Sequence, residues 1–216
     1  MAIDVAKLRL ILVTDRFLAH GRSLVDIALA AARGGATMVQ LREKDAPTRE
    51  FLETARTLKA ALKPLGVALA INDRLDIALA VDADGVHVGQ SDMPVAEARR
   101  LLGPEKFIGL SITAPDEVLR SDAEAADYLG VGPIYLQQTK ADASPPLGVE
   151  GLRDIRRLTD RPIVAIGGLT PENSGALPAA GADGFAVVSA IVGADDPETA
   201  ARRFAGLFSP RRRVRR

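Results

Sequence analysis

Cationic and amide side chains suited to a diphosphate alternate along the motif QLREK at residues 40–44. In an extended chain, residues two apart point to the same side, so Gln40, Arg42 and Lys44 are expected to face together. Arginine offers a planar fork of donors and lysine a mobile point charge, a combination that suits phosphate oxygens. Lys140, in a later loop, would add a third cation. The alternative is a solvated turn whose acidic neighbours neutralise these charges.

Two carboxylates follow neighbouring apolar segments. Asp73 comes directly after Asn72, and Asp92 lies nineteen residues further along the chain. Magnesium ions in proteins bind few carboxylates and complete their shell with water and substrate oxygens. Together with Arg42, Lys44 and Lys140, the two carboxylates predict a site where Mg²⁺ binds a diphosphate. The alternative is that each aspartate caps the helix that follows it.

A second anion site is predicted near the end of the chain. Gly167 and Gly168 allow close approach of a ligand to the backbone, and Val188-Ser189 opens the last loop. In barrels of alternating strands and helices, the loops after strands seven and eight often bind phosphate through backbone N–H groups. The alternative is that the glycines serve only a turn.

Two further residues, His87 and Ser111, have side chains that could take part in catalysis or serve the fold. His87 lies in the apolar segment GVHVG, where packing or hydrogen bonding in the interior is favoured over a role as general base. Ser111 could bind substrate or cap the next helix, and Thr113 competes for the cap. No Ser–His or Cys–His pair is apparent in the sequence, so covalent catalysis is not expected.

These residues follow short apolar runs that alternate with amphipathic stretches at roughly 25-residue intervals. Most runs are apolar throughout, as in parallel strands that are buried on both faces. The expected strands are Leu8–Thr14, Thr37–Leu41, Val67–Ile71, Gly85–Val88, Phe107–Leu110, Asp127–Val131, Pro162–Ile166 and Gly184–Val188. Eight such units predict a single (β/α)₈ TIM barrel, an α/β fold whose active site forms at the carboxyl ends of the strands. The alternative is an open doubly wound sheet, which the lack of G-x-G-x-x-G after the first strand disfavours.

Three segments carry specific helix signals. Phe51, Ala55, Leu58 and Leu62 share one face at helical spacing. Thr170-Pro171 and Asp196-Pro197 each combine an N-cap residue with a proline in the first turn, so each predicts the start of a helix.

Composition limits the remaining possibilities. The 216 residues are 47% hydrophobic and 26% charged, with no Cys and two His, which excludes disulfides, thiolate metal sites and a histidine-rich metal site. We expect a catalytic domain over residues 1–208 and an Arg-rich, disordered tail over 209–216. Without the five arginines of the last six residues, 23 basic residues face 28 acidic ones, a net charge of −5. Lacking a signal peptide and an apolar span, the protein is expected in the cytoplasm, without nucleic-acid or membrane partners and with homo-oligomerisation possible.

Taken in order, the motifs resemble those of the thiamine phosphate synthase family over about residues 8–208. They are LVTD at 12–15, VQLREK at 39–44, INDR at 71–74, GVHVGQSDMP at 85–94, GLS at 109–111, GPIY followed by TK within 132–140, AIGGL at 165–169 and VVSAI at 187–191. The resemblance implies a (β/α)₈ barrel that joins a hydroxymethylpyrimidine diphosphate to a thiazole phosphate and releases diphosphate. These two small molecules would be its partners.

The resemblance also implies residue roles. One Mg²⁺ per subunit would bind Asp73 and Asp92. The pyrimidine diphosphate would be held by Gln40, Leu41, Arg42, Glu43, Lys44, Asn72, Ser111 and Lys140, of which Arg42, Lys44 and Lys140 would be catalytic. The thiazole phosphate would be held by Gln137, Gln138, Thr139, Gly168, Val188 and Ser189.

One position departs from the family pattern. Gln137 stands where the family has a threonine expected to contact the thiazole, and glutamine keeps a donor and an acceptor on a longer side chain. Two alternatives to the synthase stay open, of which only the second rests on Gln137. One is a thiazole tautomerase on the same fold, which needs one phosphate site and no diphosphate clamp. The other is a non-catalytic binder of thiazole phosphate or thiamine phosphate.

Overall fold

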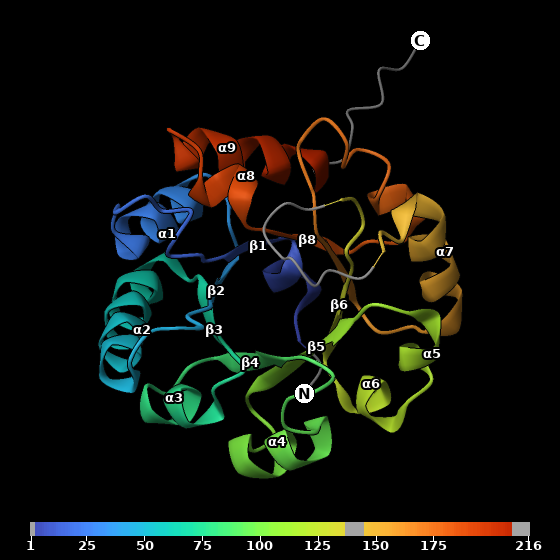
Figure 1. The fold of residues 1–216 in the computed structure, drawn as a ribbon, viewed down its shortest axis with the longest axis horizontal. Coiled ribbons are helices and arrows are strands. Elements are labelled where there is room, and N and C mark those ends of the chain that lie inside the picture. Colours follow the sequence, from blue (N-terminus) through green and yellow to red (C-terminus); the bar gives the residue numbers. More distant parts are fainter. Residues whose placement is uncertain (1–2, 137–144, 209–216) are drawn as a thin grey trace.

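The computed structural model describes residues 3–136 and 145–208, and they form a closed barrel of eight parallel strands in chain order (Figure 1). The strands are β1 (Leu10–Val13), β2 (Met38–Leu41), β3 (Ala68–Asn72), β4 (Gly85–Val88), β5 (Phe107–Ile112), β6 (Tyr128–Val131), β7 (Ile163–Ile166) and β8 (Gly184–Val187). Closure is made by β1 and β8, where Ile11 pairs with Ala186. The (β/α)₈ prediction is confirmed, and the open-sheet alternative is wrong.

Helices surround the strands on the outside of the barrel (Figure 1). The α-helices are α1 (Leu24–Arg33), α2 (Thr48–Leu62), α3 (Leu75–Ala80), α4 (Val95–Leu102), α5 (Pro115–Val118), α6 (Ser121–Ala125), α7 (Gly148–Leu158), α8 (Ser189–Val192) and α9 (Pro197–Ala205). Short 3₁₀ helices are η1 (Val5–Leu8), η2 (Lys63–Leu65), η3 (Pro178–Ala180) and η4 (Gly206–Phe208). Within the described segments, none of the helices combines the length and apolar character that a membrane span requires.

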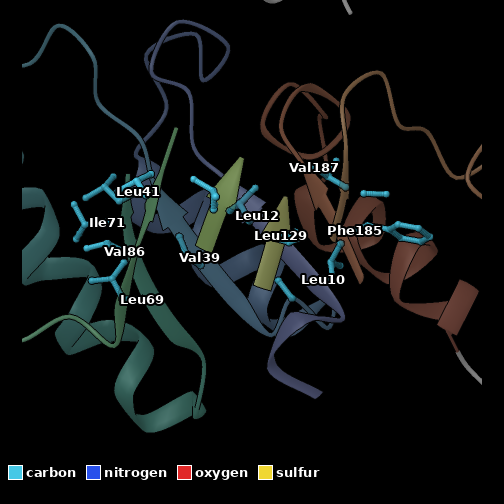
Figure 2. Packing of buried hydrophobic residues seen from close by; sticks show 14 of the residues in the cluster. Leu10, Leu12, Val39, Leu41, Leu69, Ile71, Val86, Leu129, Phe185 and Val187 are labelled. Carbon is cyan, nitrogen blue, oxygen red and sulfur yellow. The ribbon is translucent and has the colours of Figure 1, made fainter. Parts of the chain in front are cut away.

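Every strand except β4 contributes buried apolar side chains to two cores, because successive side chains point to opposite faces of the sheet. Along β1, Leu10 and Leu12 belong to the outer core between strands and helices, whereas Ile11 and Val13 belong to the core inside the barrel. Figure 2 shows part of the outer core, where Leu12, Val39 and Leu41 come from adjacent strands. Burial on both faces explains why the strands are apolar throughout, as the sequence predicts.

Two of the helix signals are confirmed, and one is wrong. The predicted apolar face of α2 is buried, and the Asp196 side chain caps α9 by accepting from the N–H groups of Glu198 and Thr199. Thr170 and Asn173 form a capped turn in which each side chain accepts from the other's backbone N–H. No α-helix follows them, because the sequence Ser-Gly-Ala-Leu-Pro interrupts the segment before the 3₁₀ helix η3.

Two strand boundaries differ from expectation by two residues, and the others agree to within one residue. The first strand begins at Leu10, because Leu8 ends the 3₁₀ helix η1. The fifth extends to Ile112, so that Ser111 lies within β5 and not after it. This second difference matters for the site, since a residue inside a strand has its direction set by the pleat.

The amino ends of the barrel carry a repeated aspartate arrangement. Directly before β4, β6 and β8, an aspartate carboxylate accepts a hydrogen bond from a backbone N–H near the start of the preceding strand. The three pairs are Asp84 with Leu69 N at 2.8 Å, Asp127 with Ile108 N at 2.7 Å and Asp183 with Ile163 N at 2.9 Å. Each carboxylate also pairs with a cation from an outer helix, namely Lys59, Arg99 and Arg156. Each aspartate therefore connects the strand that follows it to the preceding strand by a hydrogen bond and to an outer helix by an ion pair.

We expect Asp127→Ala to lower the free energy of unfolding by about 1.5–3 kcal/mol, because it leaves a buried N–H and the Arg99 guanidinium without their partner. The Asp127 side chain is only 14% exposed. The matched control is Asp116→Ala, which breaks the exposed pair with Arg120 and should cost less than about 1 kcal/mol. Urea unfolding measures both, and equal losses would contradict the structural role of Asp127.

Candidate active site

A pocket of about 540 Å³ lies at the carboxyl ends of the strands. All eight strands, or the loops that directly follow them, contribute to its wall. The lining residues are Val13, Asp15, Gln40, Arg42, Lys44, Asn72, Asp73, His87, Gly89, Gln90, Ser91, Asp92, Ser111, Thr113, Glu117, Gly130, Gly132, Pro133, Ile166, Gly167 and Val188. The position is the one that the fold predicts for an active site.

The cationic side of the pocket comes from β2 and its loop. Gln40, Arg42 and Lys44 line it, as the alternation along the chain predicts. The Gln40 amide donates to Asn72 Oδ1 at 2.6 Å, and the Arg42 backbone N–H donates to Thr14 Oγ1 at 2.9 Å, which anchors this loop to β1. The Arg42 guanidinium is 3.8 Å from the Asp15 carboxylate, a loose contact that leaves most of its donors for a ligand.

The two residues between these cations face elsewhere. The Leu41 side chain is fully buried in the outer core. The Glu43 carboxylate is buried against the Arg16 guanidinium at 2.7 Å, and its Oε1 has no partner among the described residues. Neither side chain lines the pocket, so any contact of Leu41 or Glu43 with a ligand there would come from its backbone.

Asp73 and Asp92 both line the pocket and form its anionic side. Asp73 has a left-handed backbone with φ of 63°, a conformation that Asp and Asn tolerate better than other residues with a side chain. Asp92 Oδ2 accepts from Gly89 N at 2.7 Å. Burial, followed by the negative charge of Asp92, raises the pKa of Asp73 to about 6. Neither aspartate is the N-cap of a helix, since Arg74 precedes α3 and Pro94 precedes α4.

His87 and Ser111 meet at the wall of the pocket. His87 is buried, as the sequence predicts, and its Nε2 lies 2.9 Å from Ser111 Oγ. The structure thus contains a Ser–His contact that is not apparent in the sequence, because adjacent strands bring together residues that are far apart along the chain. Neither Ser111 nor Thr113 caps α5. The cap residue is Ala114, and the Glu117 carboxylate accepts from the N–H groups of Thr113 and Ala114.

The opposite wall comes from β7 and β8. Gly167 and Gly168 have φ of 96° and 66°. A Cβ on Gly167 would lie 2.7 Å from Pro133 Cα, and one on Gly168 would lie 2.5 Å from Leu136 O, so only glycine fits at either position. Gly167 and Val188 line the pocket. Gly168 and Ser189 are the residues that immediately follow them in the sequence. Ser189 is the first residue of α8, in which Ile191 N and Val192 N donate to Val188 O, whereas the N–H groups of Ser189 and Ala190 precede the first carbonyl that the helix could offer them.

Several predicted site residues lie outside the described part of the chain. They are Gln137, Gln138, Thr139 and Lys140, and the Arg-rich tail at 209–216 lies outside it as well. Conversely, Thr113, Glu117 and Pro133 line the pocket although their residue types carry no distinctive signal. Pro133 belongs to the GPIY motif after β6, and Thr113 and Glu117 lie in the segment that follows β5, which is the signal that points to this end of the barrel.

The chain is similar to known proteins over most of its length. The family model described as thiamine monophosphate synthase matches residues 10–191. A thiamine-phosphate synthase from Albidiferax ferrireducens is 56% identical over 201 residues, which cover 93% of this chain and 92% of that protein. The chain belongs to the thiamine monophosphate synthase family. The resemblance seen in the ordered motifs is thereby confirmed.

Other members of the thiamine monophosphate synthase family also match over most of the chain. A thiamine-phosphate synthase from Syntrophomonas wolfei is 55% identical over 92% of this chain and 95% of its own length. The solved structure of the thiamine phosphate pyrophosphorylase from Pyrococcus furiosus superposes with a TM-score of 0.85 at 38% identity, covering 94% of this chain and 96% of the other. The match therefore extends over the whole barrel and its pocket.

We expect Asp73→Asn to raise the free energy of unfolding by about 1 kcal/mol at pH 8 without metal, a value discounted for partial exposure of the group. The raised pKa means that the folded state disfavours the charged carboxylate. Ionisation of Asp73 therefore lowers the free energy of unfolding as pH rises from about 4 to about 6, and this loss is complete above that range. Asparagine is preferred to alanine because it tolerates the left-handed backbone. A gain that persisted below pH 4 would contradict this origin, and urea unfolding across pH measures it.

Proposed function

We propose that this chain is a thiamine-phosphate synthase, a transferase of thiamine biosynthesis. It joins 4-amino-2-methyl-5-hydroxymethylpyrimidine diphosphate to 4-methyl-5-(2-phosphoethyl)thiazole, or to its carboxylated form, and releases diphosphate. One observation carries the proposal: a single pocket combines paired carboxylates and cations on one wall with glycine-rich backbone on the other. Such a pocket suits one ligand with a diphosphate and another with a monophosphate.

The diphosphate belongs on the wall formed by β2 to β5. Arg42 and Lys44 supply charge, and Gln40, Asn72 and Ser111 supply hydrogen bonds, all from side chains that line the pocket. In this proposal the backbone of Leu41 and Glu43 would add to this wall, and Lys140, which follows β6 in the sequence, would supply a third cation. Arginine's fork and lysine's point charge are the donors that a diphosphate needs.

Asp73 and Asp92 are the proposed ligands of one Mg²⁺ per subunit. The donor set fits, because two adjacent carboxylates carry negative charge that a divalent cation would neutralise. Burial first, and the charge of Asp92 second, raise the pKa of Asp73. The described residues hold no cluster of three or more acidic, His or Cys side chains able to bind a metal. Few carboxylates are typical of Mg²⁺ that also binds substrate oxygens. When bound, the ion would neutralise charge on the departing diphosphate.

The thiazole phosphate belongs on the wall formed by β7 and β8. Gly168, Val188 and Ser189 would bind its phosphate through backbone N–H groups at the start of α8. Residues Gln137, Gln138 and Thr139 would contact the thiazole from the loop after β6. This arrangement follows the phosphate site that recurs after strands seven and eight of such barrels.

The reaction proposed is a dissociative substitution. Arg42, Lys44 and Lys140 stabilise negative charge as the bond between the methylene carbon and diphosphate breaks. The aminopyrimidine delocalises the positive charge of the methylene, and the thiazole nitrogen then attacks that carbon. The residues of the chain contribute electrostatics and orientation, and orientation alone supplies about 7–11 kcal/mol in favourable cases.

The tautomerase alternative requires one phosphate site and a proton-transfer residue, with no use for a diphosphate wall. The combination of Asp73, Asp92, Arg42 and Lys44 in one pocket favours the synthase over that alternative. A non-catalytic binder would bind either phosphate without turnover. Incubating the protein with each substrate alone and with both, with and without Mg²⁺, separates the three. Coupled product that requires both substrates and Mg²⁺ supports the synthase, and conversion of the thiazole substrate alone would contradict it.

We expect Arg42→Lys to lower kcat/KM for the pyrimidine diphosphate by about 10–100-fold, mostly through kcat, because lysine keeps the charge and loses the fork. Arg56→Lys, an exposed change on α2, is the matched control and should leave both parameters unchanged. Steady-state kinetics with saturating thiazole phosphate measures the effect. If Arg42→Lys matched the wild type, Arg42 would not be part of the diphosphate wall.

A further inference from the structure

Three side chains form a hydrogen-bonded chain from the barrel core to the pocket. Tyr128 Oη lies 3.0 Å from His87 Nδ1, and His87 Nε2 lies 2.9 Å from Ser111 Oγ. The residues come from β6, β4 and β5, which are adjacent strands. Tyr128 belongs to the inner core, whereas His87 and Ser111 line the pocket.

Two glycines provide the space for this chain. In the register of the sheet, Gly109 pairs with both His87 and Tyr128, and Gly130 pairs with Ser111. A Cβ on Gly109 would lie 2.2 Å from the Tyr128 ring and 2.5 Å from His87 Nδ1, and one on Gly130 would lie 2.8 Å from His87 Cε1. The rings of His87 and Tyr128 therefore occupy space that a side chain at Gly109 or Gly130 would otherwise fill.

The direction of the hydrogen bonds follows from the buried tyrosine. Tyr128 is 1% exposed, and the partner of its hydroxyl among the described residues is His87 Nδ1. A buried O–H without an acceptor is costly, so Tyr128 donates to Nδ1. A ring nitrogen that accepts a hydrogen bond carries no proton, so the single proton of the neutral imidazole cannot lie on Nδ1. That proton must then lie on Nε2, which donates to Ser111 Oγ.

We infer that Tyr128 and His87 are positioning residues that hold the Ser111 hydroxyl as a hydrogen-bond donor toward the pocket. Because Ser111 Oγ already accepts from His87, its own proton is directed to an anionic oxygen of the ligand, which in the proposed function is the diphosphate. The opposite polarity would present serine lone pairs to the phosphate and repel it. The same polarity prevents His87 from taking the serine proton, so the Ser–His pair does not form a nucleophile and base.

The protonation state can be measured without turnover. The chain contains only two histidines, His20 and His87, so selective ¹⁵N-histidine labelling gives a simple NMR spectrum, and a His20→Gln variant assigns it. We expect wild-type His87 to carry its proton on Nε2 throughout the neutral pH range. In Tyr128→Phe the donor to Nδ1 is lost, and a population protonated on Nδ1 should appear. A wild-type signal protonated on Nδ1 would overturn the inference, whatever the activity.

Binding of inorganic diphosphate with Mg²⁺, followed by calorimetry, tests the consequence. Tyr128→Phe should weaken binding by about tenfold and Ser111→Ala by at least as much, since a hydrogen bond to a charged group is lost. In the Ser111→Ala background, Tyr128→Phe should have no further effect, because Tyr128 acts through Ser111. Phe107→Leu is the matched control, since Phe107 packs on Tyr128 in the inner core without belonging to the hydrogen-bonded chain.

The outcomes separate this inference from the proposed function. Equal weakening by Phe107→Leu and Tyr128→Phe, or additive effects of Tyr128→Phe and Ser111→Ala, would overturn the positioning role. If diphosphate still binds but no coupled product forms, the synthase assignment is contradicted. The NMR result on which nitrogen of His87 carries the proton would remain valid. Because the wild-type NMR spectrum requires no substitution, the inference stays testable even if a variant fails to fold.

Discussion

The parallel backbone hydrogen bonds between β1 and β8 close the sheet, and the pocket depends on that closure. Parallel strands end on the same side, so the residues at their carboxyl ends meet around one axis. Gln40, Ser111 and Val188 are far apart in sequence, yet they line one cavity because strands two, five and eight share a rim. In an open sheet the same residues would lie in a row across the width of about eight strands, and no single ligand could contact all of them.

The two ends of the barrel use charge in opposite ways. At the amino ends, Asp84, Asp127 and Asp183 each find both a backbone N–H and a cation, so their charge is compensated within the protein. At the carboxyl ends, Asp73 and Arg42 keep much of their charge uncompensated. Charges at the first end therefore stabilise the fold, whereas those at the second are available to ligands at a cost in stability. The raised pKa of Asp73 is the clearest sign of that cost.

Local patterns in the sequence predict most of the fold and much of the pocket. Apolar runs predict the eight strands, and their alternation with helical stretches predicts the barrel. The period of two in the segment at 40–44 correctly separates Gln40, Arg42 and Lys44 from Leu41 and Glu43. These predictions succeed because they depend on spacing within one element.

What the sequence does not predict depends on contacts between elements. The pair of His87 and Ser111 forms across two strands, and Tyr128 becomes important only because β6 pairs with β5. The side chain of Glu43 turns to Arg16, a residue after β1, which no local pattern indicates. Thr170-Pro171 has the residues of a helix start, but the glycine and proline that follow give a turn. The register between strands decides each of these cases except the last.

We propose that Asp73 and Asp92 hold one metal ion against a diphosphate bound by Arg42 and Lys44. Anomalous diffraction from a crystal grown with Mn²⁺ and inorganic diphosphate would locate both the metal ion and the diphosphate. We predict one strong peak about 2.1 Å from an oxygen of each aspartate, with diphosphate oxygens completing the metal's coordination shell. A peak that contacts only one of the two carboxylates, or diphosphate bound away from Arg42 and Lys44, would contradict it.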